Sequence, residues 1–408
     1  MEFSKNSIGS VKSIKKIAAI VVRGGLLLVV RKRGSAIYIT PGGKPEFGEE
    51  AVQTLRRELQ EEVCMSVQRY THFGSFSDVA AFEDNTRVDI ESYLVDSNSI
   101  ALPNQEIEEV AWIDDDYKSA GIKLGSVLEK FIIPELRRKG LIRRPNHIDS
   151  STRIVVVCDL DGTLVHNGQI GQAVQKSLGY LTTVNVHLIL ATSRAFRGVR
   201  ELTKTYYESA DLVCCNGAIV KDTQSGIQVK AIPAETVLSI TDYLRSMKAD
   251  FWVEYGDEFA CSNSSMAPWM NYPERINLAP EARINCNGVV KICIFETTKW
   301  LSPVQDLVCD SVQIIPHNNG VFDIVASGVT KARSVIELLK NTRNTIIAFG
   351  NDLNDQELIG YADRAVLVGD GLPGLDKAGH VRRVAANDYA VAKALVNEVN
   401  SILEIPRC

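Results

Sequence analysis

Acidic side chains gather at two places in this chain, and both groupings suit chemistry at phosphorus. In the first, Glu58, Glu61 and Glu62 are three and four residues apart, so a helix would carry them on one face. Three carboxylates that close repel one another unless a hard cation joins them, and oxygen ligands suit Mg²⁺ or Mn²⁺. Such an ion neutralises diphosphate oxygens and generates hydroxide from bound water. The pattern predicts a metal-dependent site that cleaves a diphosphate.

The second grouping is the loop Asp159-Leu160-Asp161-Gly162-Thr163. The apolar run Ile154–Val157 before it predicts a buried strand, which would deliver both carboxylates to the carboxyl end of a sheet, where open α/β sheets hold ligands. We expect Asp159 to attack phosphorus and form an aspartyl phosphate. Asp161 would protonate the leaving oxygen and then activate water. The loop therefore predicts a phosphomonoesterase site.

Further polar groups follow later strands or open later helices, where a parallel sheet would bring them together. Thr192 is the expected hydroxyl donor to phosphate, and Lys331 is the cation beside it. In the loop Gly350-Asn351-Asp352, either Asn351 binds metal through its amide oxygen or Asp352 does so after a one-residue shift. We favour Asn351, with Asp355 behind it. The expected metal site of this half consists of Asp159, Asp161, Asn351 and Asp355.

The elements around the first grouping predict a mixed α/β unit. The apolar pieces Ile17–Val22 and Leu26–Val30 predict a hairpin, and the acidic face predicts a helix over Glu49–Val63. The other elements expected here are strands at Ala36–Thr40, near Tyr70–Ser75, at Arg87–Val95 and ending at Trp112-Ile113, and a helix from about Ser126 to Lys139.

The second half alternates buried strands with helices, which predicts a doubly wound parallel sheet. Strands are expected at Ile154–Val157, Val186–Leu190, Leu212–Cys215 and Thr345–Phe349. Between Val229 and Asn319 the order changes to that of an α+β lid, with a helix at Ala234–Met247 and strands at Phe251–Glu254, Val289–Phe295 and Val312–Ile315. The polar stretch Pro145-Asn146-His147 predicts a linker. We expect a first domain at 1–148, a second at 149–230 and 320–408, and an insert at 231–319.

The composition of the chain limits the classes of partner that it can bind. The chain has 408 residues and a net charge of -5, which gives no bulk attraction to nucleic acid. Its apolar runs are too short to span a bilayer, and its nine cysteines form no CxxC pair. We expect a soluble cytoplasmic protein with reduced thiols that acts on small phosphorylated or diphosphate compounds, without nucleic acid or membrane partners.

The first motif resembles the Nudix box, with the pattern Gly43-(5)-Glu49-(7)-Arg57-Glu58-Leu59-Gln60-Glu61-Glu62, and the resemblance covers roughly residues 15 to 142. It implies metal binding by the three glutamates and a loop held by Glu49 paired to Arg57. The general base would be a box glutamate, Glu61 or Glu62, or an acid from another loop. The candidates for that other acid are Glu106, Glu108 and Glu109.

One residue departs from the Nudix pattern, because the glycine expected after the paired glutamates is Cys64. If Cys64 ends the helix in a left-handed conformation, its side chain costs about 1–2 kcal/mol. We expect this strain to be tolerated and the site to be active.

The second half resembles the haloacid dehalogenase superfamily of aspartate-nucleophile phosphatases, over nearly all of residues 152 to 408. The residues that carry the resemblance are Asp159, Asp161, Thr192, Lys331 and Asp355. Asn216-Gly217-Ala218 and the long insert before Lys331 are similar to the branch with a large C2-type α+β cap, the Cof-like branch, which includes sugar-phosphate and nucleotide-cofactor phosphatases. The resemblance implies a Rossmann-like core and Mg²⁺.

The leading hypothesis is a bifunctional Mg²⁺-dependent hydrolase. Its Nudix domain would cleave a nucleoside diphosphate-linked or similar diphosphate, and the second domain would dephosphorylate a resulting monoester. The alternative is a sugar or nucleotide phosphatase regulated by a ligand-sensing Nudix module. Two independent activities on unrelated metabolites stay open as well. In the lid, Trp252, Tyr255, Trp269 and Tyr272 are available for stacking on a substrate or for core packing.

Overall fold

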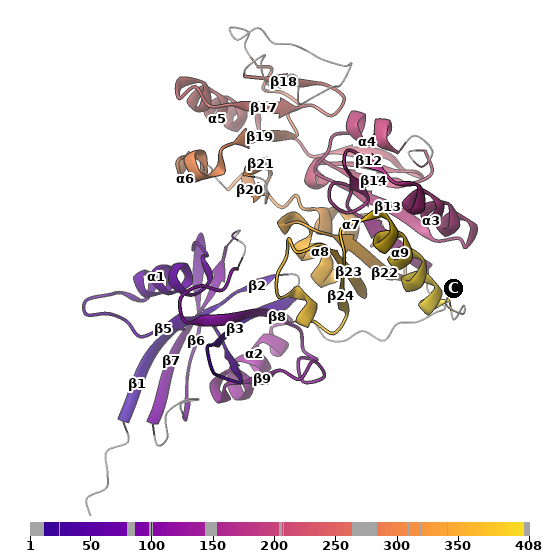
Figure 1. Ribbon diagram of the computed structural model, residues 1–408. Helices are drawn as coiled ribbons and strands as arrows, with labels where there is room; N and C mark the ends of the chain where they lie inside the picture. The colour runs from indigo at the N-terminus through magenta and orange to yellow at the C-terminus, as the bar shows by residue number, and fades with distance from the viewer. Residues whose placement is uncertain are drawn as a thin grey trace, which may run out of the picture. The chain divides into compact units, whose positions relative to one another are not determined.

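The computed structural model describes residues 12–403 except 24, 80–85, 98, 100, 143–152, 204–205, 207, 263–283, 308–309, 318–319 and 341. Contacts divide the chain into two compact units, Met1–Pro145 with Pro373–Gly379 and Asn146–Leu372 with His380–Cys408. The expected linker around residues 145–151 lies outside the described residues, as do Trp269 and Tyr272. Figure 1 shows the elements of each unit.

The first unit contains two β-sheets and the helix α1, Ala51–Val63. One sheet has the order β5-β1-β7-β6, and the other has the order β2-β3-β4-β9 with β8 paired to β3. The strands are β1 Lys12–Ile20, β2 Val22–Arg23, β3 Leu26–Lys32, β4 Ile37–Ile39, β5 Gly42–Gly43, β6 Arg69–Val79, β7 Thr86–Asp96, β8 Ile107–Ile113 and β9 Lys123–Leu124. The expected mixed α/β sandwich is confirmed.

One local prediction for this unit was wrong and another was confirmed. The hairpin joins only β2 and β3, because β1 pairs with β5 and β7 in the other sheet and the chain changes sheets at Val21. The helix expected from about Ser126 to Lys139 is confirmed, because residues 126–138 are helical, with the π-helix η1 at Leu128–Ile132 followed by α2 at Ile133–Arg138. Pro134, near the start of α2, has no N–H to donate, which accounts for the wider turn before it.

Helix α1 forms because its apolar residues recur at helical spacing. Leu55, Leu59 and Val63 are buried, and burying each of them stabilises the unit by roughly 2 kcal/mol. The helix ends at Cys64, which has φ 56° and ψ 31°. The Cys64 N–H donates to the Gln60 carbonyl at 3.2 Å, in the left-handed end that usually requires glycine.

The second unit is built on an eight-stranded sheet with the order β16-β15-β14-β13-β10-β22-β23-β24. The central strand β10, Arg153–Cys158, is parallel to β13 and β22. The other strands are β13 His187–Ala191, β14 Asp211–Cys214, β15 Ile219–Asp222, β16 Gly226–Val229, β22 Asn344–Gly350, β23 Arg364–Val368 and β24 Val381–Val384. The small two-stranded sheet beyond the Asp159 loop consists of β11 Val165–His166 and β12 Gln169–Ile170.

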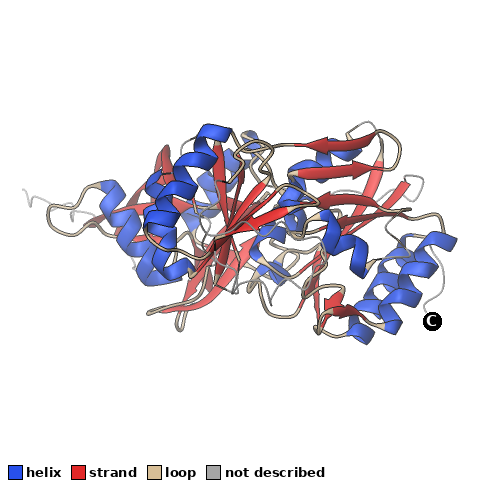
Figure 2. Cartoon of the chain, turned by 90° about the horizontal axis from the view of Figure 1, so that it is seen from above, coloured by secondary structure: helices blue, strands red, loops and turns tan. Residues whose placement is uncertain are grey.

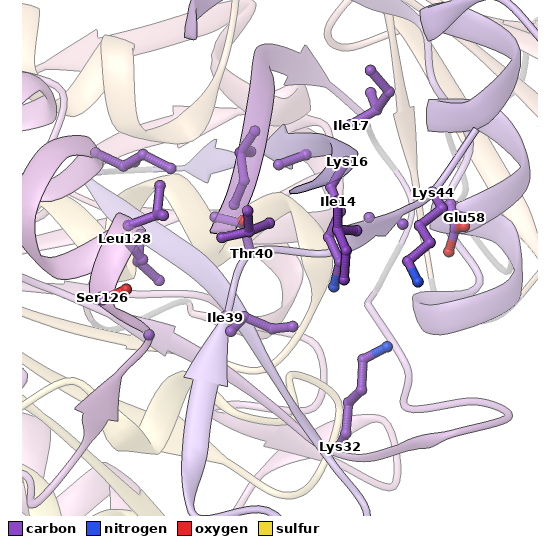
Figure 3. Close-up of a pocket in the computed structure, with 18 of the residues that line it drawn as sticks. Ile14, Lys16, Ile17, Lys32, Ile39, Thr40, Lys44, Glu58, Ser126 and Leu128 are labelled. Carbon is purple, nitrogen blue, oxygen red and sulfur yellow. The ribbon is translucent and has the colours of Figure 1, made fainter. Parts of the chain in front are cut away.

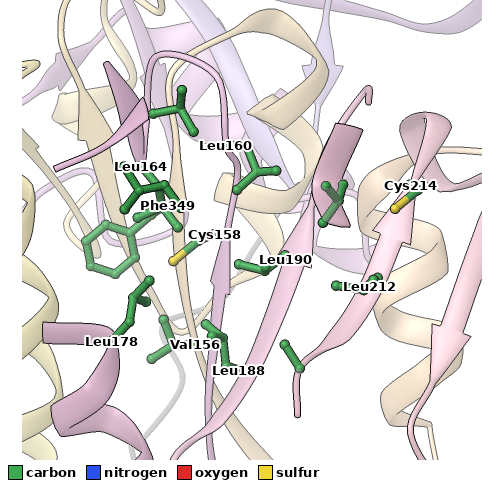
Figure 4. Packing of buried hydrophobic residues seen from close by; sticks show 14 of the residues in the cluster. Val156, Cys158, Leu160, Leu164, Leu178, Leu188, Leu190, Leu212, Cys214 and Phe349 are labelled. Carbon is green, nitrogen blue, oxygen red and sulfur yellow. The ribbon is translucent and has the colours of Figure 1, made fainter. Parts of the chain in front are cut away.

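Helices cover both faces of the large sheet (Figure 1), which confirms the doubly wound architecture. They are α3 Gln172–Thr183, α4 Phe196–Leu202, α7 Lys331–Leu339, α8 Gln356–Tyr361 and α9 Asp388–Ile402. Alternate residues of β10 point to opposite faces, so Val156 and Cys158 join the core cluster that includes Leu178 of α3 and Leu188 of β13 (Figure 4). Because both faces of the sheet are covered, its central strands have continuous apolar sequences, and polar loops follow them.

The inserted domain has a five-stranded antiparallel sheet with the order β18-β17-β19-β21-β20. Its elements are β17 Phe251–Glu254, β18 Phe259–Cys261, β19 Lys291–Phe295, β20 Val312–Pro316, β21 Val321–Ala326, α5 Ala234–Ser246 and α6 Thr297–Leu307. Figure 2 shows strands in red and helices in blue. Strand β21 lies beyond the expected end of the insert at 319. It belongs to the insert because Phe322 and Ile324 are buried in the core of this domain.

No helix within the described ranges has the length and apolar content needed to cross a bilayer.

The left-handed end of α1 leads to a stability prediction. A Cys64→Gly variant should raise the free energy of unfolding of the first unit by up to about 1 kcal/mol, because glycine adopts this conformation without a clash of its Cβ but loses more backbone entropy on folding. Urea denaturation followed by circular dichroism measures the change. Cys64→Ala is the control, because alanine keeps the Cβ and should give no gain. Equal stability of all three proteins would show that the helix end is unstrained.

Candidate active sites

The first site is built on the close approach of β5 to α1. A Cβ at Gly43 would lie 2.0 Å from Glu58 Oε1, and a Cβ at Gly42 would lie 2.2 Å from the Ile17 carbonyl oxygen. Gly42 must be glycine because the obstructing atoms belong to the backbone, whereas a side chain at Gly43 would displace the Glu58 carboxylate. The glycine backbone therefore brings the loop directly onto the acidic face of α1.

Arg57 organises the loop that joins β5 to α1. Its guanidinium donates two hydrogen bonds to the Glu49 carboxylate, from Nε at 2.8 Å and from Nη2 at 3.0 Å, and a third to the Lys44 carbonyl at 3.1 Å. Hydrogen bonding by Arg57 lowers the pKa of Glu49 to about 2. The structure thus brings Glu49 and Arg57 together in the pairing that the Nudix resemblance implied.

Two of the three glutamates of the box share one partner, and the third has another. Glu58 and Glu61 both contact Arg57 Nη1, at 2.9 and 3.3 Å, whereas Glu62 is turned inward and accepts a hydrogen bond from the Gly42 N–H at 2.8 Å. Among the described residues, no three Asp, Glu, His or Cys side chains are gathered into a metal-binding group. The expected cluster of three carboxylates is therefore not formed by the chain alone, in keeping with the mutual repulsion of like charges.

Glu62 is the member whose environment fits a divalent cation best. Its side chain is 3% exposed, and its Oε1 has no hydrogen-bond partner, although Lys32 Nζ lies 3.5 Å away. Burial raises the pKa of Glu62 to about 7, and the nearby Glu58 charge contributes in the same direction. A cation held between Glu58 and Glu62 would offset this cost of burial. The residues present therefore fit a divalent metal.

The three candidate bases outside the box, Glu106, Glu108 and Glu109, lie at different places in the structure. Glu106 lines the same cavity as Glu58 and pairs with Lys32. Glu108 and Glu109 instead pair with Arg31 at 2.9 and 2.8 Å and do not line the cavity. Of these three acids, Glu106 is the one placed at the site.

The second site is centred on a buried lysine between two carboxylates. Lys331 is 1% exposed, and its Nζ lies 2.7 Å from Asp159 Oδ1 and 2.7 Å from Asp355 Oδ1. Asp159 follows β10, Lys331 opens α7 and Asp355 follows β22, so three separate elements converge as expected. Burial raises the pKa of Asp159 to about 7, while Lys331 acts in the opposite direction and Asp355 adds to the rise. The single positive charge of Lys331 cannot neutralise both carboxylates, so a cation would fit at this site.

The loop after β22 places Asn351, rather than Asp352, against Asp159. The Asn351 side-chain nitrogen lies 3.1 Å from Asp159 Oδ2 and also donates to Thr163 Oγ1 and the Asp161 carbonyl, both at 2.9 Å. Asp352 instead caps the Leu353 N–H at 2.8 Å and faces His317 of the insert. Asp355 Oδ2 accepts from the N–H groups of Asn351 and Asp352, so it shapes the loop from behind.

Arg194 is a residue of this site that sequence reasoning missed. Its Nε and Nη2 donate to Asp161 Oδ2 and Oδ1 at 2.6 and 2.7 Å. It lies two residues after Thr192, whose buried hydroxyl accepts a hydrogen bond from the Arg194 N–H at 3.1 Å. The sequence feature that could have identified it is a positively charged side chain in the same strand-end loop as Thr192. The bidentate contact holds the expected acid–base group Asp161 in one orientation.

The insert contributes a second group of charges that the sequence did not reveal. Asp323 of β21 accepts from Asn216 Nδ2 at 2.8 Å, contacts His317 Nε2 at 2.9 Å, and lies 3.3 Å from Lys291 Nζ. Asp323 and Asp352, acting against burial, raise the pKa of His317 to about 9. Lys291 in turn donates to the Ser193 carbonyl, next to Thr192. The insert is thus tied to the strand-end loops of the core.

The aromatic residues expected in the insert take structural positions where they are described. Trp252 packs edge-on against Phe295 with ring centroids 4.9 Å apart, and the Tyr255 hydroxyl donates to the Asn285 carbonyl at 2.8 Å. Both are half-buried. These contacts favour packing over stacking on a substrate.

A second prediction concerns the ion pair between α4 and the insert. Arg197 and Glu254 lie 2.7 Å apart with side chains only 5% exposed, so Arg197→Met should cost about 3–5 kcal/mol by leaving a buried carboxylate unpaired. Arg200→Met is the control on the same helix, because its pair with Asp257 is exposed and should cost under about 1 kcal/mol. Urea unfolding followed by tryptophan fluorescence reports both. Similar losses in the two variants would refute the assignment.

Comparison with known proteins places both halves in families. A model described as haloacid dehalogenase-like hydrolase matches residues 156–395, and a NUDIX domain model matches residues 14–116. An HMP-PP phosphatase from Cronobacter sakazakii is 24% identical over 254 residues, which cover 57% of this chain and 92% of that protein. The 5-amino-6-(5-phospho-D-ribitylamino)uracil phosphatase of Bacillus subtilis is 23% identical over 267 residues, which cover 59% and 96%.

Solved structures agree on the fold of the second unit. A haloacid dehalogenase-like hydrolase from Bacteroides thetaiotaomicron superposes with a TM-score of 0.51 at 20% identity, over 60% of this chain and 99% of that one. A sugar phosphatase of haloacid dehalogenase subclass IIB gives a TM-score of 0.51 at 17% identity, over 62% and 100%. The chain is a hydrolase that belongs to the haloacid dehalogenase-like family and carries a NUDIX domain ahead of its phosphatase-like core.

Proposed function

We propose that this chain is a bifunctional Mg²⁺-dependent hydrolase. The NUDIX domain cleaves a nucleoside diphosphate-linked or similar diphosphate, and the second domain dephosphorylates a resulting monoester through an aspartyl phosphate. The observation that carries the proposal is the contact of Lys331 with both Asp159 and Asp355, joined in the same chain by a NUDIX box whose Glu62 has an unsatisfied buried oxygen. Both families are generally dependent on divalent metals.

In the second domain, Asp159 and Asp161 have separate tasks. A carboxylate oxygen of Asp159 bonds to phosphorus as the phosphorus–oxygen bond to the alcohol breaks, and Asp161 gives the leaving oxygen its proton. Water then attacks the aspartyl phosphate and loses a proton to Asp161, which frees phosphate and restores Asp159. Lys331 and the Thr192 hydroxyl hold the transferring phosphoryl group. A divalent cation would be held by Asp159, Asp161 and the Asn351 amide oxygen, once that amide turns its oxygen toward the cation, and it would supply further charge neutralisation. Asp355 holds Lys331 and the loop in place.

In the NUDIX domain, Glu58, Glu61 and Glu62 would hold a divalent cation, which would supply an activated water at the diphosphate. Arg57 and Glu49 keep the loop of Gly43 in place, so the cation site stays at the cavity wall. The inward turn of Glu62 supports its role as a ligand. Because Glu61 is 41% exposed beside Arg57, it can move toward a bound cation or take a proton from water.

The order of the two reactions supports a sequential pathway, because hydrolysis of a diphosphate produces the substrate class of a phosphomonoesterase. The curated relatives are named as phosphatases of HMP-PP and of 5-amino-6-(5-phospho-D-ribitylamino)uracil, which agrees with small phosphorylated substrates for the second domain. We propose that the NUDIX domain covers residues 1–148. The phosphatase-like core then consists of residues 149–230 and of residues 327–408, which follow the insert. The insert runs from 231 to the end of β21 at Ala326.

A third prediction separates the two activities in the full-length chain. With a diphosphate substrate, Asp159→Asn should accumulate a phosphate monoester, because loss of the nucleophile slows the second step by about 10³-fold or more. Glu62→Gln should slow release of both products by about 10²-fold or more, since it loses a metal ligand. Phosphorus NMR and mass spectrometry of a diphosphate panel follow both species.

Two controls complete this experiment. Glu62→Gln should still hydrolyse a monoester supplied directly, and Glu108→Gln, whose carboxylate lies outside the cavity, should behave as the unmodified chain. Phosphate release from the diphosphate that is undiminished by Glu62→Gln would overturn the sequential pathway. Binding of the diphosphate without hydrolysis, together with a changed monoesterase rate, would favour a sensing role for the NUDIX domain.

A further inference from the structure

The NUDIX domain contains a cavity of about 470 Å³ with two chemically different ends. Figure 3 shows Lys32, Lys44 and Glu58 on one side of the cavity, and Thr40 and Leu128 on the other. The cavity is bounded by β1, by the Gly42–Gly43 strand and by the start of η1. A substrate would therefore meet charge at one end and a mostly aliphatic wall at the other.

The charged end presents three ammonium groups, those of Lys16, Lys32 and Lys44, to one space. Burial lowers the pKa of Lys16, and the charges of Lys32 and Lys44 lower it further against the opposite effect of Glu62 and Glu58, so the lysines repel one another. Lys32 pairs with Glu106, but neither Lys16 nor Lys44 forms an ion pair with any carboxylate in the part of the chain that the structure describes. A polyanion is the ligand that relieves this repulsion.

The cavity lining also includes aliphatic side chains, which are Ile14, Ile17, Ala18, Ile39, Val88, Ile90, Val127, Leu128 and Ile132, and Figure 3 shows Ile39 and Leu128 on the side away from Lys44 and Glu58. The hydroxyls of Thr40 and Ser126 are the uncharged polar side-chain groups among the lining residues. None of the described lining residues carries an aromatic ring or a side-chain amide. Proteins hold nucleobases by stacking them on aromatic rings and by hydrogen bonds to their edges. This wall instead favours a group that gains by leaving water, namely a hydrocarbon.

We propose that this cavity takes the diphosphate monoester of a compact aliphatic alcohol. Its diphosphate lies among Lys16, Lys32 and Lys44 beside Glu58, and its hydrocarbon lies against Ile39 and Leu128. The inference rests on the proposed function, because it assigns a substrate class to the same diphosphate-cleaving site. Water adds to one phosphorus and the bridging phosphorus–oxygen bond breaks, which gives an alkyl monophosphate, inorganic phosphate and a proton. The alkyl monophosphate is then a monoester for the second domain.

The test uses the full-length Asp159→Asn chain with Mg²⁺, so that any monoester formed is not consumed. The probes are a branched five-carbon alkyl diphosphate and a nucleoside diphosphate sugar, and kcat/KM is measured for each by phosphorus NMR. The alkyl diphosphate should be preferred by at least about tenfold, the usual scale of discrimination by an apolar subsite.

A matched pair of variants locates the hydrocarbon. Ile39→Gln places an amide in the cavity and should lower kcat/KM for the alkyl diphosphate about tenfold. Ile37→Gln is the control, because Ile37 lies on the same strand, is also half-buried and does not line the cavity. It should leave kcat/KM unchanged. For the charged end, Lys16→Gln should weaken turnover of both probes, whereas the neighbouring exposed Lys15, changed to Gln, should have no effect.

The outcomes distinguish this inference from the function on which it rests. Preference for the nucleoside diphosphate sugar, or equal effects of Ile39→Gln and Ile37→Gln on the alkyl diphosphate, would overturn the aliphatic assignment and leave diphosphate cleavage intact. If the chain cleaves neither probe and no compound in the diphosphate panel, the proposed function is overturned, and the inference is overturned with it.

Discussion

The buried ammonium of Lys331 between two carboxylates is the interaction on which the second domain depends. Separating either partner from it would leave an unpaired charge in the interior, at a cost of about 3–5 kcal/mol. Asp159 and Lys331 are 172 residues apart in the chain, so their contact requires β10, α7 and β22 to be packed correctly. The same contact that orders the core therefore also holds Asp159, the proposed nucleophile.

The buried carboxylate of the NUDIX domain has fewer hydrogen-bond partners than the buried lysine of the second domain. This inward glutamate, Glu62, accepts one hydrogen bond from a backbone N–H and forms an ion pair with Lys32 at 3.5 Å. Arg57 meanwhile gathers Glu49, Glu58 and Glu61 at the surface of α1. Arg57 thus holds the loop, whereas Glu62 Oε1 has no hydrogen-bond partner, and a bound cation would supply the missing partner.

Much of the fold was predictable because strands and helices have local periodicities. The apolar runs at β10, β13, β14 and β22 and the helical stripe of α1 were confirmed to within a few residues. The failures came where a neighbour in space decides the pairing. Strand β1 joined a different sheet from β3, and β21 joined the insert because Phe322 and Ile324 complete its core.

The sequence by itself determined which carboxylates stand at strand ends and along one helical face, since spacing alone fixes the direction of a side chain on a regular element. Only the tertiary structure decided their partners. Arg194 on Asp161, Asn351 on Asp159 and His317 between Asp323 and Asp352 join residues from different elements. Likewise, the aliphatic wall opposite three lysines arises from strands and a helix that are distant in the chain. Such contacts depend on how whole elements pack, and no local pattern encodes that packing.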